Sequence, residues 1–115
     1  MGTKVIHVEV TGKDGPKLQK FYSDIFGWSL DTSNPGGYGM ASAEANGIVT
    51  GVGSTQDGGA GHVTFYVSVK DIDKALEKAT RLGGKVVMPK MSPGPNATIA
   101  LVADPEGHVI GLTQA

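Results

Sequence analysis

Two acid–base side chains lie close together near the start of the sequence. His7 and Glu9 are two residues apart, so in a β-strand both would point to the same face. An imidazole and a carboxylate on one face can move protons or bind a divalent cation. Glu9 is therefore a candidate general base. The alternatives are that the two side chains only hydrogen-bond each other, or that Glu9 is solvated in an open cleft.

A second set of polar side chains lies further along the chain. His62, Thr64 and Tyr66 alternate with apolar residues and so share one face of a predicted strand. If His62 points inward, it joins His7 and Glu9 in a set of two imidazoles and one carboxylate, which suits iron, manganese or zinc. The sequence favours the alternative, in which His62 is exposed because it follows a glycine-rich segment at the start of the strand.

These residues belong to a pattern that occurs twice, with an offset of 57 residues from His7 to Thr64. At this offset Asp14 falls on Asp71. Each copy shows an alternating strand pattern, an acidic helix cap and an apolar stripe with helical spacing. Two copies of one supersecondary unit pair to bury their apolar faces. The offset also makes Thr64 the counterpart of His7.

The first unit is predicted to contain one helix and four strands. The helix follows Asp14, which is suited to an N-cap, and ends at Gly27. The positions expected on its buried face are Leu18, Phe21, Tyr22, Ile25 and Phe26. Strands are expected at residues 4–10, 28–30, 38–44 and 48–53, with a hairpin turn at Asn46-Gly47 between the last two.

A glycine-rich linker, residues 55–61, leads to a second unit with the same order of elements. Its helix follows Asp71. The positions expected on the buried face are Ile72, Ala75, Leu76, Ala79 and Leu82. Strands are expected at residues 62–69, 85–88, 98–103 and 108–113, with a loop at 89–96 and a turn at 104–107. His108 follows that turn and is expected at the surface.

The predicted fold is α+β, in a single domain over residues 1–115. Two tandem β-α-β-β-β units, about residues 4–54 and 62–113, form curved mixed sheets around a cavity, with the helices outside. Twisted sheets have concave faces, and a cavity of this kind is the usual ligand site. The residues expected to line it are His7, Glu9, Thr64 and Tyr66.

Composition narrows the classes of partner. The formal net charge of −1 gives no basis for binding nucleic acid or an anionic membrane. No apolar stretch reaches membrane-spanning length, and the N-terminus does not resemble a signal peptide. The sequence contains no cysteine, which excludes a disulfide framework and a thiolate metal site. We therefore expect a cytoplasmic protein with a small-molecule ligand.

The paired units resemble the vicinal oxygen chelate superfamily, which contains glyoxalase I, bleomycin-resistance proteins and extradiol dioxygenases. The motifs that carry the resemblance are His7 in the first strand, Phe26-Gly27-Trp28, Leu82-Gly83-Gly84, and Asp104-Pro105-Glu106-Gly107 before the last strand. These motifs span almost the whole chain. A second combination, which consists of Gly12-Lys13-Asp14, residues 63–67, residues 99–101 and residues 104–112, resembles small bacterial members without a settled substrate. The resemblance also implies a homodimer, since small members often build each cavity from two chains.

The resemblance implies a metal site that this chain does not retain in full. Metal-using members take one His, Glu or Gln ligand from the first and last strand of each unit. His7 matches one of these positions, whereas the others fall on Thr64 and on or beside Gly51 and Gly111. Threonine is a poor ligand for a divalent cation, and glycine has no side chain. We therefore expect no metal cofactor, although a divalent metal at His7, Glu9 and His62 is the alternative.

Two functions follow from these residues. The first is a metal-free protein that binds a small, aromatic or amphipathic molecule through His7, Glu9, Thr64 and Tyr66. The second is a metal-dependent lyase, isomerase or dioxygenase with a rearranged site at His7, Glu9 and His62. The sequence leaves open whether the protein is an enzyme.

Overall fold

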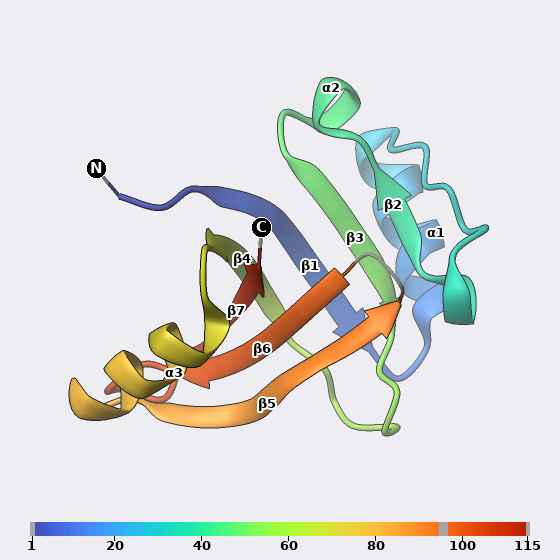
Figure 1. Ribbon diagram of the computed structural model, residues 1–115. Helices are drawn as coiled ribbons and strands as arrows, with labels where there is room; N and C mark the ends of the chain where they lie inside the picture. Colours follow the sequence, from blue (N-terminus) through green and yellow to red (C-terminus); the bar gives the residue numbers. More distant parts are fainter. Residues whose placement is uncertain (1, 95–96, 115) are drawn as a thin grey trace. The chain divides into compact units, whose positions relative to one another are not determined.

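A computed structural model describes residues 2–94 and 97–114 of the chain. Its internal contacts divide this part of the chain into two compact units. The first unit comprises residues 7–63, and the second comprises residues 2–6 together with residues 64–114. Both units combine strands with helix, so the predicted α+β class is confirmed (Figure 1). Among the described residues, no helix has the length and apolar character needed to cross a membrane.

The strands of the first unit follow the order β2-β3-β1. β1 (Val5–Gly12) pairs in parallel with β3 (Val49–Ser54), and β2 (Gly39–Ala41) is antiparallel to β3. The register places Glu9 opposite Gly51. Because paired residues of neighbouring strands point to the same face, the side chains of β1 lie next to the glycines of β3.

The helix α1 (Gly15–Phe26) begins and ends where the sequence predicts. The Asp14 carboxylate accepts a hydrogen bond from the Lys17 backbone N–H at 3.0 Å, which caps the first turn. Gly27 ends the helix in the left-handed conformation, with a φ of 71°.

The predicted buried face of α1 is only partly right. Three of its five residues are more than half exposed, namely Phe21, Ile25 and Phe26. The helix meets β3 through a more polar side: the Gly15 backbone N–H donates to Ser54 Oγ at 2.7 Å, and Gln19 Nε2 donates to the Val52 carbonyl at 2.8 Å. These bonds fix the rotation of the helix and turn part of its apolar stripe toward solvent.

The segment between α1 and β3 differs from the prediction in two places. Residues 28–30 do not form a strand, and pairing there is reduced to one bridge between Asp31 and Met40. The Asn46-Gly47 hairpin turn was also wrong, because α2 (Ala43–Asn46) occupies this position. Ser42 caps α2 by accepting a hydrogen bond from a backbone N–H, and alanine and glutamate favour helix over a two-residue turn.

The second unit has the predicted β-α-β-β-β order, and its strands are arranged as β4-β7-β6-β5. These elements are β4 (Val63–Val69), α3 (Ile72–Arg81), β5 (Lys85–Gly94), β6 (Ala97–Ala103) and β7 (Val109–Gln114). Asp71 caps α3, as predicted. The core beneath α3 consists of Ile72, Ala100, Val102 and Leu112.

Two expectations for the second unit were wrong. Leu82 lies after the end of α3 and is 69% exposed, so it does not belong to the buried face. Residues 89–94 extend β5 instead of forming a loop, and residues 95–96 lie outside the described residues. The prolines are tolerated because β5 is an edge strand with irregular pairing to β6.

Candidate functional site

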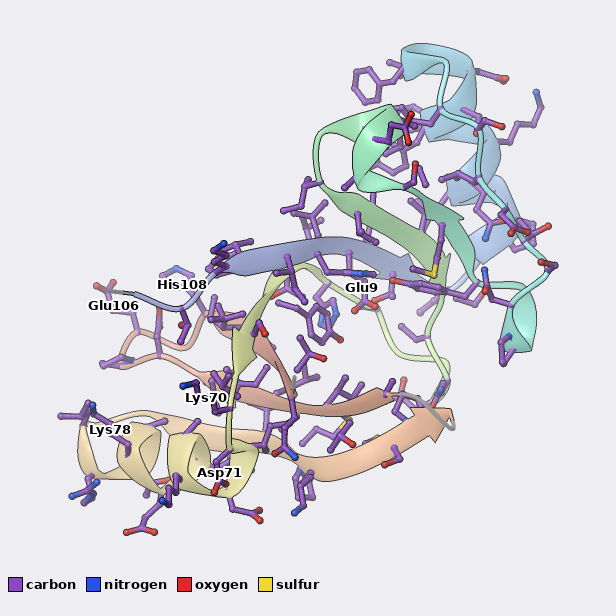
Figure 2. All side chains as sticks on the ribbon, turned by 45° about the horizontal axis from the view of Figure 1, so that its top comes forward. Glu9, Lys70, Asp71, Lys78, Glu106 and His108 are labelled. Atoms are coloured by element: carbon purple, nitrogen blue, oxygen red, sulfur yellow. The ribbon has the colours of Figure 1, made fainter. Side chains whose placement is uncertain are left out.

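His7 and Glu9 lie on the same face of β1, and the hydroxyl of Tyr38 joins them into one polar cluster. Tyr38 Oη donates to Glu9 Oε1 at 2.9 Å and lies 2.9 Å from His7 Nε2. A hydroxyl has one proton, so when it donates to Glu9 it must accept from His7. His7 therefore carries its proton on Nε2. Figure 2 labels Glu9 on β1, and its side chain is only 13% exposed.

His62 completes the cluster from the end of the linker. Its Nε2 lies 2.8 Å from Glu9 Oε2, and the side chain is 25% exposed. Two backbone hydrogen bonds with Thr11, at 2.9 and 3.1 Å, hold His62 beside β1. The expectation that His62 is a surface residue was therefore wrong, and its inward alternative is the arrangement found. The backbone pairing with Thr11 is the physical reason, and the glycine-rich linker concealed it.

The ring of Tyr38 lies against β3 where the strand carries no side chains. A Cβ atom built on Gly51 would lie 1.7 Å from Tyr38 Oη, and one built on Gly53 would lie 2.8 Å from Tyr38 Cδ1. Real Cβ atoms essentially never approach another heavy atom this closely, and the distance at Gly51 is far too short. The two glycines are therefore required by the ring. The ring also lies nearly parallel to that of His7, with an interplanar angle of 13° and ring centroids 6.3 Å apart.

A turn before β2 holds Tyr38 in this position. The short 3-10 helix η1 (Pro35–Gly37) precedes it directly. Asn34 Nδ2 donates to the carbonyls of Asp31 and Tyr38, both at 2.9 Å. Gln19 Nε2 also donates to the Gly37 carbonyl at 2.9 Å, which ties the turn to α1. These side-chain hydrogen bonds to backbone carbonyls hold the turn and so position the phenol of Tyr38.

Tyr38 was not predicted as a site residue from the sequence. Tyr38 was expected at the beginning of a strand, with no spacing that related it to His7. A signal was present in β3, where Gly51 and Gly53 alternate and so leave one face of the strand bare. Such a bare face marks a place where another group approaches the backbone closely.

Burial affects the protonation of the cluster. It lowers the pKa of His7, because the charged imidazolium loses solvation, while the nearby Glu9 carboxylate opposes this change. His7 is thus kept neutral, in agreement with its role as a donor through Nε2.

Within residues 2–94 and 97–114, no three His, Cys, Asp or Glu side chains are arranged so that they could hold one metal ion.

Thr64 and Tyr66 lie in the second unit, on β4. Thr64 is buried, and its hydroxyl donates to the Val109 carbonyl. Tyr66 is the register partner of Gly111, and a Cβ atom built on Gly111 would lie 2.4 Å from the Tyr66 ring. A tyrosine ring thus covers the glycine of the last strand in this unit too. Outside both groups, His108 is exposed, as predicted, and its ring contacts Asp104.

Comparison with known proteins places these features in context. The sequence model of the Glyoxalase/Bleomycin resistance protein/Dioxygenase superfamily matches residues 4–112. Proteins named "Putative glyoxylase CFP32" from Mycobacterium bovis and Mycobacterium tuberculosis are each 32% identical over 115 residues, covering 94% of this chain and 44% of theirs. The chain therefore spans less than half the length of these relatives.

Solved structures show the same fold. A glyoxalase/bleomycin resistance protein/dioxygenase superfamily member from Vibrio splendidus is similar, with a TM-score of 0.64, 18% identity and 98% coverage of both chains. Methylmalonyl-CoA epimerase from Mycobacterium tuberculosis also has a TM-score of 0.64, with 16% identity and coverage of 96% of this chain and 86% of its own.

Proposed function

Because the chain belongs to the Glyoxalase/Bleomycin resistance protein/Dioxygenase superfamily, as its sequence motifs suggested, we propose that it binds a small molecule without the metal ion of the metal-using members. The binding groups are the Glu9 cluster, defined as His7, Glu9, Tyr38 and His62. The observation that carries this proposal is the Tyr38 phenol, which lies between His7 and Glu9 and above Gly51.

The side chains at the usual ligand positions do not fit a metal ion. Gly51 and Gly111 offer no side-chain ligand atoms, and tyrosine rings cover both. The Thr64 hydroxyl donates a hydrogen bond to the Val109 carbonyl. His7 is the remaining member of the set, and one imidazole alone does not hold a divalent cation against water. These contacts support the proposed loss of the usual site.

The Glu9 cluster has the chemistry of a small-molecule site. It combines a neutral imidazole, a phenol and a largely buried carboxylate, which can orient a polar ligand group. The nearly parallel rings of His7 and Tyr38 add an aromatic surface, which favours a planar or amphipathic ligand. Glu9 is the candidate base if a reaction occurs. In the second unit, Thr64 and Tyr66 remain predicted ligand contacts.

A metal-dependent lyase, isomerase or dioxygenase is the second candidate function. One observation favours it: His62 reaches Glu9, and His7 reaches the same carboxylate through the Tyr38 hydroxyl. A metal at His7, Glu9 and His62 would require this cluster to rearrange, because its members are now bonded to one another. It would supply a Lewis acid for a chelating substrate.

Metal analysis separates the two candidates. The chain is purified without a nickel column, and iron, manganese, nickel and zinc are measured by mass spectrometry. We expect less than 0.1 metal ion per chain, on the order of a contaminant, and no rise in melting temperature with added cations. A stoichiometric metal that is lost in His7→Ala would overturn the proposed function in favour of the second candidate. A thermal-shift screen of small aromatic and carbonyl compounds then tests ligand binding directly.

We also propose that the chain forms a homodimer, as the family resemblance implies. Light scattering after size-exclusion chromatography measures the mass in solution. A dimer gives twice the mass of 11.8 kDa, and a concentration-independent monomer would contradict the proposal.

A further inference from the structure

The side chain at position 51 and the ring at position 38 cannot occupy the same space. A Cβ atom on Gly51 would lie 1.7 Å from Tyr38 Oη, 2.2 Å from Cζ and 2.7 Å from Cε2. All three contacts involve the distal part of the ring, including the hydroxyl. Any residue larger than glycine at position 51 must therefore displace the phenol from His7 and Glu9.

In the second unit, a tyrosine ring also covers a glycine of the last strand. Gly111 occupies the corresponding place on β7, and the Tyr66 ring covers it, with Cδ2, Cε2 and Cγ within 2.4–2.6 Å of a Cβ atom built there. The two rings arrive from different elements, since Tyr66 lies on β4 whereas Tyr38 follows η1. A tyrosine ring thus lies on the last-strand glycine of each unit, although the two rings come from different elements. We conclude that the ring occupies the space of the missing side chain in each unit.

We infer that Tyr38 is the residue that excludes a metal ion from the first unit, and that Tyr38 and Gly51 form an exchangeable pair. With Tyr38 on Gly51, His7 and Glu9 are bonded to a phenol and the site takes an organic ligand. With a carboxylate at position 51 and no ring at position 38, the same face would take a divalent cation. This inference rests on the proposed function, because it assumes that the wild-type chain is metal-free.

The strand register explains why a carboxylate at position 51 would bind a cation. Gly51 is the direct partner of Glu9, so a glutamate there would stand beside a largely buried carboxylate. Two neighbouring carboxylates repel each other unless one is protonated or a cation lies between them. His7 precedes Glu9 by two residues on the same face and supplies an imidazole. Oxygen and nitrogen ligands together suit manganese, iron or zinc.

The test uses the double variant Tyr38→Ala/Gly51→Glu in the full chain. Its control is Tyr38→Ala/Gly51→Leu, which fills the same space with a side chain of similar size that cannot bind a metal. Both are compared with wild type and with Gly51→Glu alone. Zinc and manganese binding is measured by calorimetry and by the change in melting temperature, and folding is checked by circular dichroism.

We expect Tyr38→Ala/Gly51→Glu to bind one cation per chain, at least tenfold more tightly than the leucine control and wild type. We expect Gly51→Glu alone to melt at a lower temperature than the double variant, because the ring still occupies the space. A folded double variant that binds zinc no better than its control would overturn the inference, and so would a Gly51→Glu variant as stable as wild type. If wild type itself binds a stoichiometric metal, the proposed function fails instead, so the two failures are distinguishable.

Discussion

The substitution Gly51→Ala tests the central contact of the site with a single methyl group. The added Cβ would lie 1.7 Å from Tyr38 Oη, and no small adjustment removes an overlap of this size. The ring must leave β3, and the hydroxyl then loses its hydrogen bonds to His7 and Glu9, each 2.9 Å long. The mutation therefore acts on the cluster through space, without changing any of its members.

The magnitude follows from the bonds lost. A hydrogen bond between neutral groups contributes about 0.5–1.5 kcal/mol, and one to a charged group about 1.5–3 kcal/mol. Loss of the His7 and Glu9 bonds therefore costs about 2–4.5 kcal/mol. Alanine restricts the unfolded chain more than glycine does, which offsets about 0.4–1 kcal/mol. The expected net loss of about 1–4 kcal/mol lowers the melting temperature by about 4–16 °C in a domain of this size.

Urea unfolding followed by circular dichroism measures the change. Gly94→Ala is the matched control, because Gly94 also lies in a strand but a Cβ atom there meets nothing within 4 Å. The double variant Tyr38→Ala/Gly51→Ala should lose less stability than the sum of the two single variants, since the ring and the methyl group no longer compete. A Gly51→Ala protein within about 0.5 kcal/mol of wild type would refute the assigned position of the Tyr38 ring.

Three further predictions concern stability. Gln19→Ala should cost about 1–3 kcal/mol in urea unfolding, because it removes two hydrogen bonds to backbone carbonyls, while Gln56→Ala in the exposed linker serves as a neutral control. Ile72→Ala should cost about 2–5 kcal/mol, whereas Ile25→Ala should change the free energy of unfolding by less than about 1 kcal/mol, because Ile72 is fully buried and Ile25 is 55% exposed. Burial lowers the pKa of His7, so the unfolded chain binds a proton at this residue more readily than the folded chain does. The His7 contribution to stability is therefore complete above about pH 6.5 and falls as the pH drops toward the folded pKa. A His7→Gln variant should lose this part of the pH dependence. An NMR titration showing a His7 pKa above about 6.5 would contradict this prediction.

The sequence predicted the elements with strong local signals. Asp14 and Asp71 cap their helices, and Gly27 ends the first one, because the backbone groups that need these residues are set by the helix itself. The rotation of α1 was not predictable from its apolar stripe, because the Gln19 bonds to two carbonyls far along the chain decide it. His62 illustrates the same limit, since its place beside Glu9 depends on backbone bonds to Thr11 across a glycine-rich linker.

The positions of the two tyrosines differ in how far the 57-residue repeat predicts them. Position 66 is the counterpart of Glu9 at the 57-residue offset, and Tyr66 is the parallel partner of Gly111, just as Glu9 is the partner of Gly51. The place of Tyr66 above that glycine therefore follows from the repeat and the strand register. Tyr38 has no such counterpart, because the offset leads to Pro95. Its ring reaches β3 from a turn, so only the bare face left by Gly51 and Gly53 records its presence in the sequence. Glycines that alternate in a strand, beside polar residues of the neighbouring strand, therefore carry two pieces of information. They lack side chains that could bind a ligand, and they indicate that another group covers the strand there.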